Sequence, residues 1–191
     1  MQTRATPAPA TPLERFNTAP AAEAAQTLLA CLHSRAWAHR LTAHRPYPDL
    51  PALLAAADEA AYDLSPADLA EALAAETLPA LPEDTYAAAH TALSAAHAAY
   101  ESRFGHVFVI SLDDLSADEA LNHVLAAIRS RLANDPDEER LVASEELRRL
   151  ARGRVRRLLG ARGCDISGSA AGARPASDDS HPANHPKPPP Q

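Results

Sequence analysis

The sequence of 191 residues has little of what β-sheet or disulfide-rich proteins need. It contains 6 glycines for turns and only 4% aromatic residues, and its β-branched residues are sparse, which argues against a sheet protein. Its 2 cysteines, Cys31 and Cys164, lie far apart. They therefore predict no disulfide framework, and we expect the protein in a reducing, cytoplasmic compartment.

Two further absences limit the possible partners. The formal net charge of −7 opposes nucleic-acid binding, because that binding needs an excess of Lys and Arg, and it leaves no polybasic membrane anchor. No apolar run approaches the roughly 20 residues that span a bilayer. The start of the chain also lacks the apolar stretch of a signal peptide. We expect neither a nucleic-acid nor a membrane partner.

Alanine and other good helix formers are abundant instead. Hydrophobic residues make up 46% of the chain, enough for a core, and many are alanine, the residue with the highest helix propensity. The sequence therefore predicts an all-α fold, a compact helical bundle over residues 13–160. Residues 1–12 and 161–191 are rich in Pro, Ala and small polar residues and cannot bury enough apolar surface, so we expect disordered tails there.

Capping residues divide the predicted domain into helices. A short turn and then a longer helix are expected over residues 13–43, separated near Pro20. Asp49 and Ser65 are expected to cap the next two helices, each with a proline in its first turn. A loop is predicted over residues 77–84, and a long helix from about residue 85 to Phe104.

The second half contains one β-prone run between helices. Gly105 is expected to close the long helix as a C′ glycine. The run over residues 106–112, HVFVISL, is expected to be an extended segment laid across the helices. Ser116 and Asp135 then cap the two last helices, the second ending near Gly160.

The bare residues carry no familiar catalytic motif, since a Gly-rich phosphate loop, HExxH, CxxC and GxSxG are all missing. His33, His39 and His44 do not share one helical face, so we predict no metal site. The arginine-rich run over residues 148–157 could attract an anion, or could only complement the dipole at a helix C-terminus.

Three colinear motifs resemble the 2-oxo-4-hydroxy-4-carboxy-5-ureidoimidazoline (OHCU) decarboxylases of urate breakdown. AAHAAYESRFGHVFVI (residues 95–110) resembles their Asn-x-x-Tyr-x-x-(Arg/Lys)-Phe-Gly signature, with His97 at the position of the Asn. RSRLANDPDEER (129–140) is similar to their Arg-Leu-x-Asn-Asp-x-x-x-Glu element, and LARGRVRRLL (150–159) to their closing helix. SRAWAHRL and RPYPDLPALLAAADEA are similar to their opening segments.

This resemblance implies an all-α bundle, usually a homodimer, that uses no cofactor. It implies decarboxylation of a small anionic substrate, the ureidoimidazoline, to (S)-allantoin. Arg154 matches the family's substrate-binding arginine, and Phe108, Val109 and Ile110 match the stretch whose backbone amides contact the substrate.

The sequence departs from the family where the acid and base should lie. Glu76-Thr77 stands in place of the His-Pro motif, and no Glu-Gln pair occurs between residues 76 and 100, where a Ser-x-x-Glu-Gln motif is expected. The residues that could take over are Glu76, His44, His90 and His106. Of these we consider Glu76 the candidate catalytic residue, which would need a raised pKa.

Three functions remain open: an active decarboxylase, a relative that binds a purine-derived anion without catalysis, and a helical protein-interaction module. For any retained site, we predict that Glu76, Phe108 and Arg154 line one shared pocket.

Overall fold

The computed structural model describes residues 10–79, 87–113 and 115–160, and these ranges contain helices and no strand. The helices are α1 (Pro12–Thr18), α2 (Ala21–Leu29), α3 (Arg35–Ala43), α4 (Leu50–Tyr62), α5 (Pro66–Ala75), α6 (Ala87–Phe104), α7 (Ala117–Arg131) and α8 (Pro136–Gly160). The predicted all-α fold class is confirmed. The predicted tails lie outside the described residues except for residues 10–12, and Pro12 opens α1.

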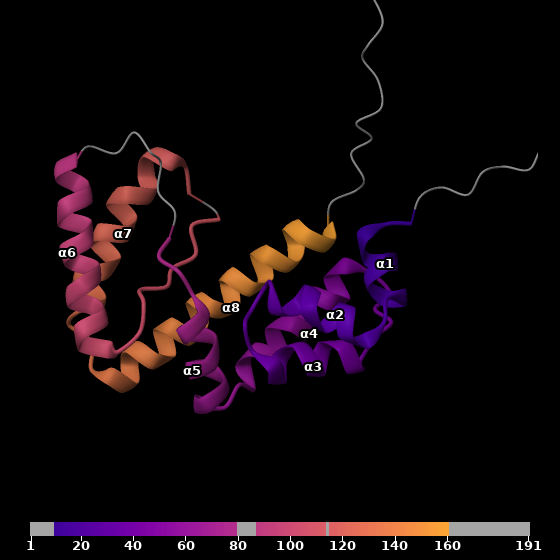
Figure 1. Cartoon of the computed structure of the whole chain (residues 1–191). Helices are drawn as coiled ribbons and strands as arrows, with labels where there is room; N and C mark the ends of the chain where they lie inside the picture. Colours follow the sequence, from indigo (N-terminus) through magenta and orange to yellow (C-terminus); the bar gives the residue numbers. More distant parts are fainter. Residues whose placement is uncertain (1–9, 80–86, 114, 161–191) are drawn as a thin grey trace, which may run out of the picture.

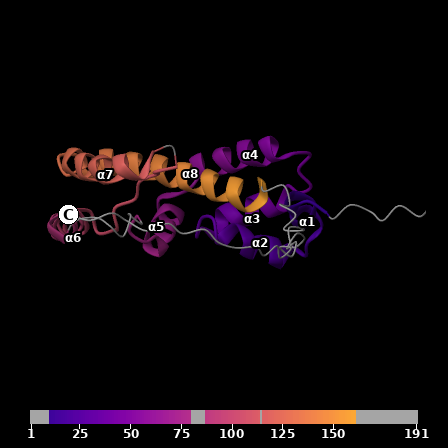
Figure 2. The ribbon, with the colours of Figure 1, turned by 90° about the horizontal axis from the view of Figure 1, so that it is seen from above.

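Helix α8 connects the two halves of an elongated molecule. It has 25 residues and runs from the pair α6 and α7 to the group α1–α4, with α5 between the two (Figure 1). The view from above shows the same elongation (Figure 2). The larger apolar cluster joins α1–α5 to α8, and the smaller one joins α6, α7 and the segment between them. The region next to α5 therefore lies between the two apolar clusters.

The helix starts predicted at Asp49, Ser65 and Asp135 are confirmed by their capping contacts, and the start predicted near residue 85 lies outside the described residues. Asp49 Oδ1 accepts the N–H of Ala52 at 2.8 Å, and Asp135 Oδ1 accepts that of Glu138 at 2.9 Å. Ser65 is the predicted cap of α5, and it forms a capping box with Asp68. Each cap satisfies backbone donors that a helix leaves unpaired and contributes about 1 kcal/mol.

The prediction of one longer helix after Pro20 is wrong, because the chain breaks it into α2 and α3. Ser34 caps α3 by accepting the N–H of Trp37 at 3.3 Å. The physical reason lies in the spacing of Leu28 and Trp37. Nine residues correspond to two and a half turns at about 3.6 residues per turn, so one unbroken helix would place these side chains on opposite faces. The break allows both to be buried in the same core.

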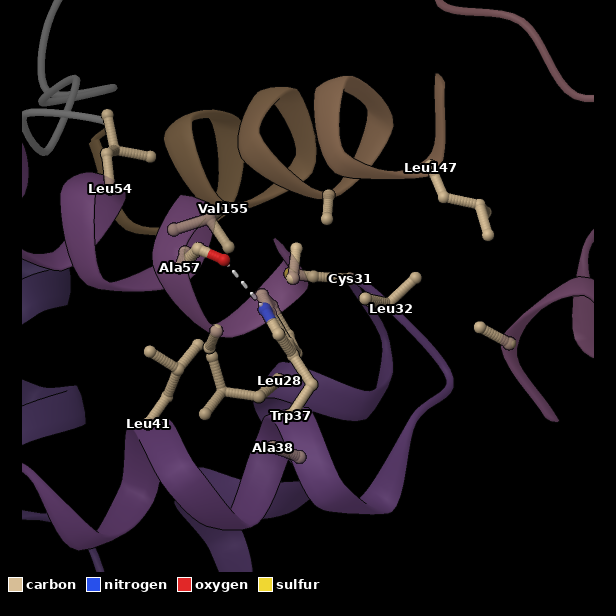
Figure 3. Close-up of a cluster of buried hydrophobic side chains, with 14 of the residues drawn as sticks. Leu28, Cys31, Leu32, Trp37, Ala38, Leu41, Leu54, Ala57, Leu147 and Val155 are labelled. Carbon is tan, nitrogen blue, oxygen red and sulfur yellow. Dashed lines mark hydrogen bonds between the residues drawn. The ribbon is translucent and has the colours of Figure 1, made fainter. Parts of the chain in front are cut away.

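Trp37 is the largest buried side chain of the larger cluster. It is 1% exposed, and its indole Nε1 donates to the carbonyl of Ala57 on α4 at 3.0 Å (Figure 3). Val155 brings α8 to the same cluster. The single tryptophan thus fixes α3 against α4 and, through that core, against the helix that carries Arg154.

The segment between α6 and α7 is extended, as predicted for HVFVISL. Gly105 has φ +78°, a left-handed conformation that favours glycine and ends α6. Phe108, Val109 and Ile110 follow and are all buried. Phe108 and Ile110 enter the smaller cluster and Val109 enters the larger one. The segment therefore lies between the two cores and alternates its side chains between them.

His97 makes the stability of this region depend on pH. Burial lowers the pKa of its imidazole below the ordinary 6.5, and the neighbouring Glu101 raises it by less. Its Nε2 is buried without a hydrogen-bond partner among the described residues. As pH falls below about 6.5 the unfolded chain binds a proton at His97 that the folded chain resists, so the free energy of unfolding falls.

We expect His97→Asn to remove this part of the pH dependence. Urea unfolding followed by circular dichroism from pH 7.5 to 5.5 measures it, and the difference between wild type and variant isolates His97 from the other histidines. The wild type should lose more stability on acidification, by at most about 1.4 kcal/mol per pH unit. Parallel curves for the two proteins would contradict the prediction.

Candidate functional site

A pocket of about 350 Å³ lies where three segments meet: the residues after α5, the extended segment, and α8. We call it the Arg154 pocket. Its volume is within the range of small-ligand sites. Glu76, Phe108 and Arg154 all line it, so the predicted shared pocket is confirmed. The described lining residues are Glu76, Thr77, Leu78, Pro79, Phe108, Val109, Ile110, Leu112, Asp113, Leu150, Arg154 and Arg157.

Glu76 and Arg154 form a bidentate ion pair in this pocket. Glu76 is the C-cap of α5, where the chain leaves the helix beside α8. Arg154 Nη1 donates to Glu76 Oε1 at 2.7 Å and Nη2 donates to Oε2 at 2.8 Å, a geometry that guanidinium and carboxylate groups favour. The side chains are 6% and 30% exposed, Glu76 being the more buried. A carboxylate of the chain thus occupies the bidentate position on Arg154.

The surroundings hold Arg154 in its charged form. The hydrogen bond to Glu76 raises the pKa of the guanidinium, against the opposite effect of burial. Nη1 also donates to the backbone carbonyl of Cys31 at 3.0 Å. Burial raises the pKa of the Cys31 thiol to about 11, so this neighbour is neutral at physiological pH and no candidate nucleophile. Among the described residues, Glu76 is the acidic side chain within hydrogen-bonding distance of Arg154.

The extended segment offers backbone donors at the wall of the pocket. The N–H groups of Phe108, Val109 and Ile110 have no acceptor among the described residues, although these residues are buried. The next N–H, that of Ser111, donates to Glu146 Oε2 at 2.7 Å. Unpaired buried donors are uncommon in folded proteins, and donors beside a guanidinium suit a ligand rich in oxygen acceptors.

A buried polar cluster of Tyr100, Arg131 and Glu139 holds this segment in place. Arg131 Nη1 donates to the carbonyl of Val109 at 2.6 Å, and its Nε donates to Glu139 Oε1 at 2.8 Å. The guanidinium lies 4.5 Å from the ring centroid of Phe108, within cation–π range. The Tyr100 hydroxyl donates to Glu139. Burial, with this hydrogen bond, raises the pKa of Tyr100, so the hydroxyl stays protonated as a donor.

Four residues were considered as replacements for the missing acid and base, and of the three whose side chains the structure describes, Glu76 alone lines the Arg154 pocket. His44 lies in a small hollow near α4, and its Nδ1 donates to the carbonyl of Arg40 at 2.7 Å. His106 lines a separate groove between α5 and α6. The side chain of His90 lies outside the described residues.

The arginines of residues 148–157 do more than complement the dipole at the C-terminus of α8. They form ion pairs with carboxylates on α4, on α8 itself, at Glu76 after α5, and at Asp113 between α6 and α7. The pairs are Arg148 with Asp58 and Glu145, Arg149 with Glu145 and Glu146, Arg152 with Asp58, Arg154 with Glu76, and Arg156 and Arg157 with Asp113.

Sequence reasoning missed Asp113 and Arg157, which also line the pocket. Arg157 follows Arg154 by three residues, a spacing that places both on one helix face, so the sequence did contain a signal for it. Asp113 gave no such signal. Across residues 10–79, 87–113 and 115–160, no group of three His, Cys, Asp or Glu could hold a metal ion. No helix found there is long and apolar enough to cross a membrane.

Comparisons with known proteins match this fold. A family model described as OHCU decarboxylase matches residues 17–77 and 75–156, so its two parts meet at Glu76. A crystal structure of (S)-allantoin synthase is similar with a TM-score of 0.61 and 23% identity, covering 78% of this chain and 54% of that chain. This chain therefore spans about half the length of that protein.

A crystal structure of OHCU decarboxylase in the presence of (S)-allantoin has a TM-score of 0.60 and 21% identity, covering 70% of this chain and 96% of that chain. A search of curated proteins gave no match. At these identities the two crystal structures support the fold, and the family model supports the family.

Proposed function

Since the chain belongs to the OHCU decarboxylase family, we propose that it decarboxylates the ureidoimidazoline acid of urate breakdown in the Arg154 pocket. The observation that supports this most directly is the pairing of Glu76 with Arg154 inside a pocket of about 350 Å³. One group can bind the carboxylate of the substrate and the other can carry a proton. A homodimer, as the resemblance implies, and a cytoplasmic location, as the two distant cysteines predict, remain part of the proposal.

Substrate binding in this scheme exchanges one carboxylate for another. The substrate carboxylate takes the bidentate position on Arg154 and displaces Glu76. The N–H groups of Phe108, Val109 and Ile110 are available for carbonyl oxygens of the same ligand. Glu76 then remains in the pocket without its guanidinium partner. Two carboxylates at close range repel each other, and this repulsion is relieved when one of them takes up a proton.

The protonated Glu76 carboxyl is the acid that the reaction needs. The bond between the substrate's carboxyl carbon and the hydroxyl-bearing ring carbon breaks, carbon dioxide leaves, and the electron pair moves into the ring toward the C=N nitrogen. Glu76 delivers its proton to the neighbouring, ureido-bearing ring carbon from one face, and the hydroxyl proton passes to the ring nitrogen as the ring carbonyl forms, which gives one enantiomer of allantoin. The product is neutral, so Glu76, charged again, re-forms its ion pair with Arg154 and releases the product.

The same ion pair also favours a second function, anion binding without turnover. The bidentate pair and the carbonyl of Cys31 together use three of the guanidinium's five donors, so Arg154 can bind an anion whether or not Glu76 takes up a proton. If the substrate exchanges with Glu76 but Glu76 takes up no proton, the pocket binds a urate-derived acid and leaves it intact. Allantoin or urate analogues would then raise the thermal midpoint without carbon dioxide release.

The deciding experiment is a urate oxidase-coupled assay scored for the enantiomeric excess of allantoin. The wild type should give an excess of one enantiomer, and Arg154→Ala should give the value of the uncatalysed reaction. Glu76→Gln removes the proton donor at nearly constant size, so its rate should fall by about 10²–10⁴.

Arg149→Ala is the matched control, because Arg149 is an exposed arginine of the same helix that pairs with Glu145 and Glu146. It should keep the wild-type enantiomeric excess. A wild type that gives no excess over the uncatalysed reaction would refute the decarboxylase.

A further inference from the structure

A second arginine–carboxylate pair lines the Arg154 pocket. Arg157 Nη1 donates to Asp113 Oδ1 at 2.7 Å, and both residues line the pocket with Arg154 and Glu76. The Asp113 side chain is 22% exposed and that of Arg157 58%. The pocket is therefore lined by two guanidinium–carboxylate pairs, whose arginines lie three residues apart on α8.

Gly153 shows that the position of Asp113 depends on a close approach to α8. A Cβ atom at residue 153 would lie 1.8 Å from Asp113 Oδ2 and 3.0 Å from its Cγ, so the carboxylate lies against bare helix backbone. Glycine inside a helix costs about 1 kcal/mol relative to alanine. The chain has this unfavourable residue at the place where it makes room for Asp113.

The Asp113–Arg157 pair presents a hydrogen-bond acceptor beside a hydrogen-bond donor. The guanidinium has donors beyond the one directed to Asp113, and the carboxylate has further lone pairs. A ureido group has the complementary pattern, because its carbonyl accepts and its terminal amino group donates. A second ligand carboxylate would meet the negative charge of Asp113, whereas a neutral ureido group would not.

We propose that Asp113 and Arg157 form a ureido subsite, so that the pocket selects small acids carrying a ureido group. Arg154 binds the carboxylate of the ligand, Arg157 donates to the ureido carbonyl, and Asp113 accepts from the terminal amino group. The inference rests on the proposed function for the place of the carboxylate, but it concerns specificity and requires no turnover.

Two small acids of matched shape test the subsite by isothermal titration calorimetry on the full chain. N-carbamoylglycine and N-acetylglycine share a carboxylate, a spacer and a carbonyl, and differ in a terminal amino group against a methyl group. The amino group can donate to Asp113 and the methyl group cannot. A hydrogen bond to a charged group makes the carbamoyl compound bind about tenfold more tightly or better in the wild type.

Three variants separate the parts of the subsite. Gly153→Ala adds a methyl group that displaces the Asp113 carboxylate, while it keeps every charge and favours the helix. The preference for N-carbamoylglycine over N-acetylglycine should then fall to within about twofold, because no hydrogen bond distinguishes the two probes any longer. Asp113→Ala should reduce this preference to the same level. Arg157→Gln should weaken both probes, because both have the carbonyl. Arg149→Gln on the same helix should change neither, and circular dichroism checks the fold of each variant.

The outcomes distinguish this proposal from the decarboxylase. The ureido subsite would be overturned if the wild type bound both probes with equal affinity or showed no saturable binding of N-carbamoylglycine. It would also be overturned if the preference for N-carbamoylglycine survived both Gly153→Ala and Asp113→Ala. If one of these results were found in a protein that still makes chiral allantoin in an Arg154-dependent reaction, the decarboxylase proposal would be supported and the ureido subsite refuted. A preference that Gly153→Ala removes, in a protein that gives racemic allantoin, would support the subsite while the decarboxylase fails.

Discussion

Replacing Arg131 with methionine is expected to lower the free energy of unfolding by about 3–5 kcal/mol, because it leaves a buried carboxylate without its cation. The Glu139 side chain is 0% exposed and that of Arg131 is 8% exposed, so water cannot replace the missing partner. The carbonyl of Val109 loses its donor as well. Urea unfolding followed at 222 nm measures the loss.

A double variant shows whether the stranded charge causes this loss. Arg131→Met combined with Glu139→Leu removes both charges, and apolar replacement of a whole buried pair is often close to neutral. We expect the double variant to be more stable than Arg131→Met alone, with a coupling energy obtained from the complete cycle. A loss of less than about 1 kcal/mol for Arg131→Met would contradict the explanation by a stranded charge.

Trp37→Ala is expected to lower the free energy of unfolding by about 3–5 kcal/mol, the range for a large aromatic side chain removed from a core. Trp37 is 1% exposed and contributes to the cluster that joins α2, α3, α4 and α8 (Figure 3). Its loss leaves a cavity that helices fixed by many other contacts cannot close completely. Because Trp37 is the only tryptophan, unfolding must be followed by circular dichroism.

Trp37→Phe is the matched control for the cavity. It keeps an aromatic ring but removes the hydrogen bond to the carbonyl of Ala57, so a smaller loss of about 1–2 kcal/mol is expected. If both variants lose the same stability, the hydrogen bond matters more than the volume. If neither loses stability, the core collapses around the missing ring.

The two sites with the largest expected stability losses also position the candidate site. Arg131 holds the carbonyl of Val109 and packs on Phe108, and both residues line the Arg154 pocket. Trp37 fixes α3 and α4 against the part of α8 that carries Arg154. Variants at these positions are therefore expected to impair ligand binding without contacting the ligand, which the N-carbamoylglycine titration can measure.

Glu76 lies where the two parts of the family match meet. From the resemblance we expected a His-Pro motif at this place, where the sequence has Glu76-Thr77. The geometry explains how a glutamate could serve: at the C-cap of α5 it reaches the guanidinium of Arg154 with both oxygens. Under the proposed function, Glu76 would supply the proton beside Arg154 that we expected a histidine to supply.

The sequence by itself determined the helices and most of their limits. Asp49, Ser65 and Asp135 accept hydrogen bonds from residues three positions further along, and the conformation of Gly105 is a property of one residue. Such signals act over a few residues, so they can be read without knowing the fold. The resemblance also indicated Glu76, Phe108 and Arg154 as neighbours.

The tertiary structure alone decided the partners of these residues. Glu76 and Arg154 are 78 positions apart, and Asp113 and Arg157 are 44 apart. With 25 acidic and 18 basic side chains, charge patterning permits many such pairs and selects none. The break between α2 and α3 was decided in the same way, because the burial of Leu28 and Trp37 in one core outweighs the local preference for a continuous helix. Long-range packing brings carboxylates to arginines, and it is this packing that forms the pocket.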